Sequence, residues 1–239
     1  MWLGEQGVDL KTQSNAALSS LADSLQKLNR ADNAKAQSPH YLKELLDAVK
    51  NLKSSISTAV VAHQKIVAWA ETEIASAGEH LLHQWDKLEE SDRKFVRELV
   101  LTASSNPRPE YDDKYYAEWK SASWSPAPRN EAAKSLPWLL LKLPDDQDVK
   151  DAIRNAAKDQ VPTVRFLLAS EVWRIYEKNA AFLVEILNGY IADEPNATVL
   201  DAVCLGLQNA SHLQSVRDLI PGLYGRMSAE AAKYDYRRT

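Results

Sequence analysis

The stretch DQVPTVRFLLASEV, residues 159–172, contains the pattern that decides the fold expected for this chain. Within it, Leu168, Ala169 and Val172 have apolar counterparts 36 residues earlier and 35 residues later. The counterparts are Ala132, Ala133 and Leu136 on one side, and Val203, Cys204 and Leu207 on the other. A period in the mid-thirties is typical of stacked helical hairpins, in which each repeat is one pair of helices.

The second helix of each expected hairpin repeats in the same way, which predicts three units at residues 129–158, 162–192 and 196–227. Its apolar positions are Val149 and Ile153, then Phe182 and Ile186, then Leu219 and Leu223. The connectors are short and rich in Asp, Pro and Asn, so neighbouring helices should run antiparallel. Because a single amphipathic hairpin cannot bury its own apolar faces, we expect the units to stack around one continuous core.

Asp159, the pair Val164-Arg165 and the pair Leu168-Ala169 together resemble the signature of HEAT repeats. In HEAT and armadillo-like proteins the arginine typically bonds to aspartates of adjacent turns. The resemblance therefore implies that Arg165 is structural. Residues 124–133 are also similar to the start of helical-repeat regions attached to bacterial NTPases.

Three positions qualify the resemblance to HEAT repeats. Pro137 is similar to the proline that kinks the first helix in many of them. In the third unit, Leu200 replaces the arginine and Pro221 falls in the expected second helix. These departures indicate either a terminal, capping repeat or a different register in that unit.

The N-terminal half carries a different helical pattern. Apolar residues from Leu18 to Leu28 recur every three or four positions and predict a first helix that ends near Arg30. No proline or glycine interrupts residues 40–77, so a single long second helix is expected there, ending at Gly78. Its stripe has the spacing of a coiled-coil seam: Leu42, Leu45, Val49, Leu52, Ile56, Ala59, His63, Ile66 and Ala70.

A third helix is expected at residues 92–103, capped by Ser91. The following residues contain four prolines and should be largely irregular, with one helical turn around Lys114 to Lys120. The sequence thus predicts an all-α protein in three parts. They are a helical hairpin or coiled-coil-like region at 1–103, a boundary segment rich in proline and aromatic residues at 104–128, and HEAT-like repeats forming a short α-solenoid at 129–239.

The boundary segment provides the candidate interaction residues, which are Tyr115, Tyr116, Trp119, Trp124 and Arg129. Tyr, Trp and Arg dominate the hot spots of protein interfaces, so one interpretation is an exposed recognition patch. The favoured alternative is that the rings fold back over the open end of the repeats. The first hairpin would otherwise expose its apolar face there.

No motif of a catalytic or cofactor site occurs in the sequence, which lacks a phosphate-binding glycine loop, a Gly-x-Ser-x-Gly elbow and a His-Glu-x-x-His pair. The single cysteine, Cys204, has apolar neighbours and is expected to be a buried structural thiol. His80 and His83 are too few for a metal site, and His63 on the seam is expected to be a core residue. We therefore expect no catalytic residue, no metal and no cofactor.

A net charge of −4 and a pI near 5.8 give no overall attraction to nucleic acid or anionic lipid, so neither is an expected partner. No segment approaches about 18 uninterrupted apolar residues. The first residues also lack the basic and apolar pattern of a leader. These features predict a cytoplasmic protein without a membrane span.

Together, the patterns favour a non-catalytic protein–protein interaction module or an accessory subunit of a larger complex. Its contacts would be a protein partner or self-association through the 42–70 heptad helix. A regulatory component of a bacterial NTPase or nuclease defence assembly is a related hypothesis.

An enzyme is the third hypothesis, because some DNA glycosylases that act on alkylated bases are built wholly from HEAT-like repeats. Trp119, Asp113, Trp173 and Arg165 are of the residue types that such enzymes use. The acidic balance of the chain argues against this hypothesis, since DNA affinity depends on many Lys and Arg contacts with phosphates.

Overall fold

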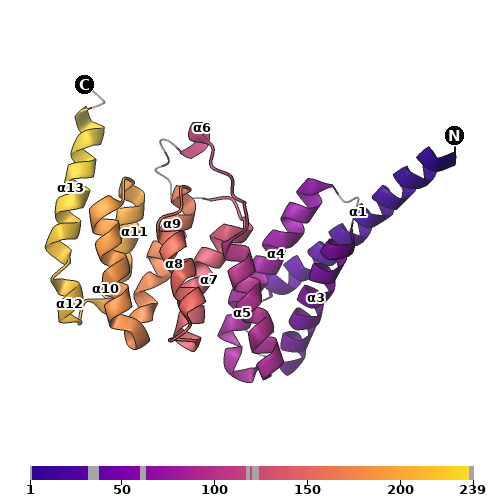
Figure 1. Cartoon of the computed structure of the whole chain (residues 1–239), viewed down its shortest axis with the longest axis horizontal. Helices are drawn as coiled ribbons and strands as arrows, with labels where there is room; N and C mark the ends of the chain where they lie inside the picture. Colours follow the sequence, from indigo (N-terminus) through magenta and orange to yellow (C-terminus); the bar gives the residue numbers. More distant parts are fainter. Residues whose placement is uncertain (1, 32–37, 60–62, 117–118, 120–123, 237–239) are drawn as a thin grey trace. The chain divides into compact units, whose positions relative to one another are not determined.

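The computed structural model describes residues 2–31, 38–59, 63–116, 119 and 124–236. Within these ranges every regular element is a helix and no strand occurs, which confirms the all-α prediction (Figure 1). The chain divides into two compact units. Unit 1 consists of residues 1–103 and 126–132, and unit 2 consists of residues 104–125 and 133–239.

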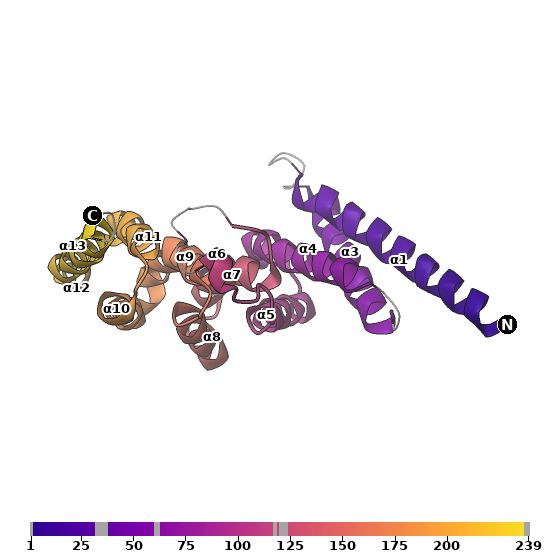
Figure 2. The ribbon, with the colours of Figure 1, turned by 90° about the horizontal axis from the view of Figure 1, so that it is seen from above.

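Unit 1 is built on three helices that pack against one another: α1 (Trp2–Asn29), α3 (Pro39–Thr58) and α4 (Gln64–His83). A short 3₁₀ helix, Trp85–Lys87, and α5 (Glu90–Ser104) follow them. The N-terminal turns of α1 extend beyond the other helices of the unit (Figure 2). The apolar stripes meet in a core of fully buried side chains that includes Leu18, Leu25, Leu45, Leu52 and Leu81.

The expected single helix over residues 40–77 is wrong, because the chain forms α3 and α4 there instead. α3 ends at Thr58, and α4 begins after His63, whose Nδ1 accepts a hydrogen bond from the N–H of Lys65. His63 is therefore an exposed capping residue and does not lie on a core seam. The hydroxyls of Ser57 and Thr58 bond to carbonyls of the preceding turn, which weakens a helix at this point. Two shorter helices also bury each other's apolar stripes, which one long helix would leave without a partner.

Two further helix boundaries in unit 1 differ from those expected. α4 continues past Gly78 to His83. A β-carbon at position 78 would lie 3.0 Å from Leu99 and 3.3 Å from Val100, so the glycine allows α5 to approach and does not end α4. α5 begins at Glu90, which places the expected cap, Ser91, inside its first turn.

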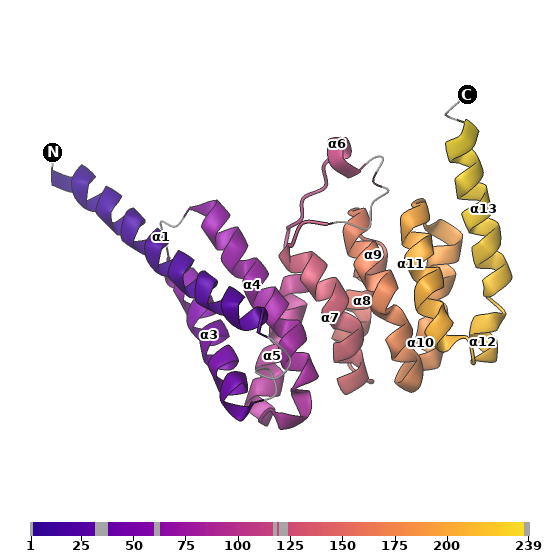
Figure 3. The same cartoon turned by 180° about the vertical axis from the view of Figure 1, so that it is seen from behind.

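Unit 2 contains the helices of the C-terminal half. The elements are α6 (Asp113–Tyr116), the C-terminal part of α7 (Pro128–Lys142), α8 (Gln147–Ala157), α9 (Pro162–Glu171), α10 (Tyr176–Asp193), α11 (Ala197–Leu207), α12 (Gln214–Arg217) and α13 (Ile220–Tyr236). α9 packs along α11, α8 packs on α9, and α10 contacts α8, α11 and α13 (Figure 3). The first residues of α7 belong to unit 1, where Ala132 packs with Ala75 of α4 and Ala103 of α5.

Most ends of these helices follow from residues that the sequence shows directly. Asp146 and Asn196 cap α8 and α11 by accepting hydrogen bonds from backbone N–H groups, and Pro162 occupies the first position of α9. Pro137 lies inside α7, as expected. Pro221 lies in the first turn of α13, where a missing N–H breaks no helical hydrogen bond. It therefore starts the last helix and does not interrupt it.

Gly206 sets the distance between α11 and the elements beside it. A β-carbon built at this position would lie 3.1 Å from Cδ1 of Trp173 and 3.2 Å from the backbone oxygen of Ala169. Because helical backbone cannot move aside as a flexible side chain can, a larger residue would push α9 and α11 apart. Gly189 in α10 is the opposite case, since nothing lies within 4 Å of its β-position.

Alanine is expected to change stability in opposite directions at these two glycines. Gly189→Ala should raise the free energy of unfolding by about 0.5–1 kcal/mol, because glycine is the poorer helix former. In Gly206→Ala the contact with Ala169 outweighs that gain, since overpacking costs about 1–3 kcal/mol. Urea unfolding followed by circular dichroism measures both variants. Equal stabilisation by the two substitutions would contradict the close approach of α11 to α9.

Candidate functional site

The aromatic residues of the boundary segment gather on unit 2 together with one ring of α9. We name this cluster the aromatic patch, and its members are Tyr111, Tyr115, Tyr116, Trp119, Trp124 and Phe166. Tyr116 and Trp119 are buried, whereas Tyr111, Tyr115 and Trp124 keep 40%, 51% and 37% of their surface exposed. The patch therefore has a buried base and an exposed rim.

Two groups of rings make up the patch. Tyr116 stacks on Tyr111 with 5.9 Å between ring centroids and meets Tyr115 edge-on at 4.7 Å. Phe166 meets Trp119 edge-on at 5.6 Å and lies 6.1 Å from Trp124. The backbone N–H of Trp119 donates to the carbonyl of Tyr116 at 3.2 Å, which joins the two groups.

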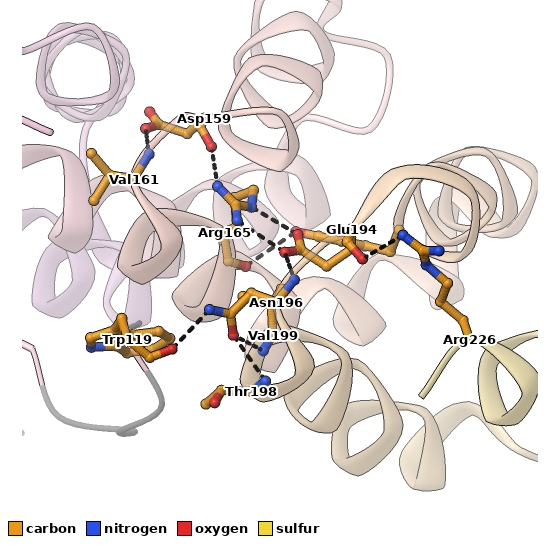
Figure 4. A network of polar contacts seen from close by, with 10 residues as sticks. Trp119, Asp159, Val161, Arg165, Glu194, Asn196, Thr198, Val199 and Arg226 are labelled. Atoms are coloured by element: carbon orange, nitrogen blue, oxygen red, sulfur yellow. Dashed lines mark hydrogen bonds and ion pairs between the residues drawn. The ribbon is translucent and has the colours of Figure 1, made fainter. Parts of the chain in front are cut away.

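Asn196 attaches the patch to the start of α11 (Figure 4). Its Nδ2 donates to the backbone oxygen of Trp119 at 2.9 Å. Its Oδ1 accepts from the N–H groups of Thr198 and Val199 at 2.9 and 3.3 Å, which caps α11. One side chain thus starts a helix and fixes the backbone of a buried ring.

Three carboxylates border the exposed tyrosines. Glu110 and Asp112 are exposed, and Asp113 is hydrogen-bonded to Tyr111, which raises the pKa of that phenol. Among the residues that the structure describes, none forms an ion pair with these three carboxylates. Against these three carboxylates stands one exposed cation, Lys114, so residues 110–115 carry a net charge of −2.

Four of the five candidate residues from the sequence lie in the aromatic patch, and the fifth, Arg129, belongs to unit 1. The two tryptophans contact α9 through Phe166, while three rings stay exposed. Phe166 and Asn196 were not expected at this site. In the sequence they look like an ordinary apolar residue and an ordinary helix cap, and no local pattern connects either of them with Trp119.

Arg165, the arginine in the sequence resemblance to HEAT repeats, is 8% exposed and joins two connectors of unit 2 (Figure 4). Its Nε and Nη2 donate to the carboxylate of Glu194, between α10 and α11, at 2.8 and 2.9 Å. Its Nη1 donates to the backbone oxygen of Asp159, between α8 and α9, at 2.5 Å. The Asp159 carboxylate accepts instead from the N–H of Val161 at 2.8 Å. The guanidinium therefore holds the connectors and is not free for a ligand.

Two more side chains extend this network. The Tyr190 hydroxyl donates to the backbone oxygen of Arg165 at 3.2 Å, and burial raises the pKa of the phenol. Nη2 of Arg226 in α13 donates to the backbone oxygen of Glu194 at 3.2 Å. The network thus reaches from the connector before α9 to the last helix.

A groove of about 570 Å³ lies between α8 and α10, beside the Arg165 network. Ile186 and Gly189 contribute to its lining, together with Arg154 and Glu185, which pair with each other at 2.6 Å. The lining charges of both signs are largely matched within the groove. It therefore lacks the excess of one charge that would select a class of ligand.

The residues that the sequence suggested as candidates for chemistry make packing contacts with other side chains. Sγ of Cys204 lies 3.1 Å from Sδ of Met227, and burial raises the pKa of the thiol, which makes it a poor nucleophile. Trp173 stacks on Tyr176 and lies under the guanidinium of Arg174. Within the described ranges, no three His, Cys, Asp or Glu side chains are grouped so that they could hold a metal ion.

Fold and site together define the chain as an all-helical protein with an exposed aromatic patch. Comparison of the chain with protein-family models, with curated proteins and with solved structures finds no match. In the part of the chain that the structure describes, no helix has both the length and the hydrophobicity needed to cross a membrane.

Proposed function

We propose that this protein is a non-catalytic interaction module, in which HEAT-like helical hairpins present the aromatic patch to a protein partner. The observation that carries the proposal is the exposure of Tyr111, Tyr115 and Trp124 on a base of buried rings. Tyrosine and tryptophan are enriched in interface hot spots, because they offer a large rigid area at a small cost in conformational entropy.

The packing of unit 2 supports the HEAT-like part of this proposal. The helix pairs α7–α8, α9–α10 and α11–α13 occur at the three places where the period of the sequence predicts hairpins. Neighbouring first helices, α9 and α11, pack along each other. Arg165 bonds to connectors before and after its own hairpin, as the arginine of a HEAT repeat does between adjacent turns.

The triple variant Tyr111→Ala, Tyr115→Ala and Trp124→Ala tests the role of the patch. We expect a partner that co-purifies with the wild-type chain from its native host to fall about tenfold or more in yield, because truncated hot-spot residues each cost roughly 1–2 kcal/mol of binding free energy. Quantitative mass spectrometry of the co-purified proteins measures the change, and circular dichroism checks that the variant is folded.

Leu205→Ala with Tyr224→Ala is the matched control. These side chains on α11 and α13 are 64% and 61% exposed, so the control also removes apolar surface from unit 2 but leaves the patch intact. It should retain the partner. Equal recovery of the same proteins by the patch variant, the control and the wild type would contradict recognition through the patch.

A further inference from the structure

Among the described residues, the exposed rim of the aromatic patch combines rings with three carboxylates and one lysine, Lys114, which precedes Tyr115. In the chain, Tyr111 lies between Glu110 and Asp112, and Tyr115 comes two positions after Asp113. No cation among the described residues lies over either ring. The positive charge of Arg165 acts on Tyr111, but that guanidinium is already paired with Glu194.

Elsewhere in unit 2 the chain places one of its own arginines in such surroundings. The guanidinium of Arg174 lies 4.2 Å from the ring centroid of Trp138 and 4.5 Å from that of Trp173. The same guanidinium is paired with the carboxylate of Glu171. Two aromatic faces and one carboxylate together hold a single arginine.

A second arginine in the same unit also combines an aromatic face with carboxylates, here one ring and two acidic side chains, Asp151 and Glu185. The guanidinium of Arg154 lies 4.9 Å from the ring centroid of Phe182 and pairs with Glu185 at 2.6 Å. The rim of the aromatic patch has the rings and the carboxylates of these two arrangements. Only the guanidinium is missing from the described residues.

We infer that the aromatic patch binds a linear, arginine-rich segment of a partner protein. The guanidinium groups stack on Tyr111, Tyr115 and Trp124 and pair with the carboxylates beside them. This inference rests on the proposed function and adds the chemistry of the partner. The negative charge of the rim excludes a phosphate-bearing partner and favours a cationic one by complementarity.

Arginine fits this surface better than lysine does. Its planar guanidinium stacks on aromatic faces and bonds to carboxylates in a two-pronged geometry, and it is less strongly hydrated than an ammonium group. Both contacts can form at once, as they do for Arg174. A lysine ammonium is a compact charge without a face that could stack on a ring.

Fluorescence anisotropy with labelled peptides and the full chain tests the inference. The first peptide alternates arginine with glycine, and three further peptides replace arginine with lysine, glutamine or glutamate. We expect the arginine peptide to bind about tenfold more tightly than the lysine peptide, since stacking favours guanidinium over ammonium. The glutamine and glutamate peptides should not bind. Affinity should fall as salt is raised, because part of it is electrostatic.

Two variants with the same loss of charge separate the patch from the general acidity of the chain. Glu110→Gln with Asp112→Asn and Asp113→Asn removes the rim carboxylates, whereas the control removes three exposed carboxylates of unit 2 outside the patch. The control is Asp145→Asn with Glu177→Gln and Asp201→Asn. Only the rim variant, and the triple aromatic variant described above, should lose affinity for the arginine peptide.

The results that would contradict the inference differ from those that would contradict the proposed function. Equal affinity for the arginine, lysine and glutamine peptides, or equal loss in the rim variant and the acidic control, overturns the inference. If a native partner still depends on the patch in that case, the proposed function stands and the partner has a different chemistry. If no partner depends on the patch, the proposed function fails whatever the peptides do.

Discussion

Replacing Glu194 with alanine is expected to lower the free energy of unfolding of unit 2 by about 3–5 kcal/mol. The side chain of Glu194 is 1% exposed, and its carboxylate accepts two hydrogen bonds from Arg165 and one from the N–H of Asn196 at 2.9 Å. Without it, the buried guanidinium keeps only its bond to the backbone of Asp159. An uncompensated buried charge is costly, so the connectors on both sides of α9 and α10 should loosen.

Hydrogen exchange with mass spectrometry locates this effect, and urea unfolding measures its size. Exchange should rise in α9, α10 and α11 and stay unchanged in α1, α3 and α4 of unit 1. Glu185→Ala is the matched control, because Arg154 and Glu185 form the same two-pronged pair at 2.6 and 3.0 Å on an exposed surface. Its effect should be much smaller, since water screens the charges. Similar losses in both variants would contradict a special role for the buried pair.

The double variant Arg165→Met with Glu194→Leu separates lost attraction from stranded charge. Removing both charges together should restore much of the stability that Glu194→Ala loses, because no buried ion is left without a partner. A double variant as unstable as Glu194→Ala would show that the pair contributes mainly through its own attraction. The aromatic patch should also be monitored, because Asn196 bonds to both Glu194 and Trp119.

Glu73→Ala is expected to destabilise unit 1 by about 2–4 kcal/mol. Glu73 of α4 is 8% exposed, and its carboxylate accepts hydrogen bonds from Gln26 at 2.6 Å, Asn29 at 3.0 Å and Trp69 at 3.1 Å. Gln26 and Asn29 belong to α1, so one carboxylate connects the first and third helices of the bundle. Its loss leaves several donors without an acceptor in a partly buried place.

Urea unfolding with hydrogen exchange over α1 and α4 measures this loss. Glu44→Ala is the control, since Glu44 is exposed on α3 and its one ion pair among the described residues is with His40, one turn earlier. Its effect should lie within about 0.5 kcal/mol. Glu73→Gln should fall between the two, because the amide keeps one acceptor oxygen but turns an NH₂ group toward other donors. A Glu73→Ala variant as stable as the wild type would contradict the connection between α1 and α4.

The prediction of one long helix from the apolar stripe of residues 40–77 was wrong. Apolar spacing over residues 40–77 is compatible with one long helix and equally with two antiparallel helices that bury each other's stripes. The position of the break depends on α1, which packs on both α3 and α4. The prediction that Gly78 ends the helix was wrong for a related reason. The glycine is needed for the close approach of α5 and not for a break in the backbone of α4.

In the C-terminal half, apolar spacing and connectors were enough to predict helices, whereas their arrangement as repeated hairpins stays a prediction. For Arg165, the sequence predicted acidic partners but not which residues and atoms they are. The sequence suggested aspartates, whereas the carboxylate comes from Glu194 and Asp159 contributes its backbone oxygen. At the aromatic patch, composition identified four rings, but it did not show which rings are buried and which are exposed.

All-helical character, caps such as Asp146 and Asn196, and the mid-thirties repeat can be derived from the sequence alone. They depend on backbone preferences and hydrogen bonds between residues a few positions apart. Two features depend on the three-dimensional packing. They are the division of the N-terminal apolar stripe between α3 and α4, and the attachment of the aromatic patch. Asn196 and Trp119 are 77 positions apart, and Arg165 and Glu194 are 29 apart. Such pairs meet only because the helices between them pack together in the folded chain, and no local pattern contains that information.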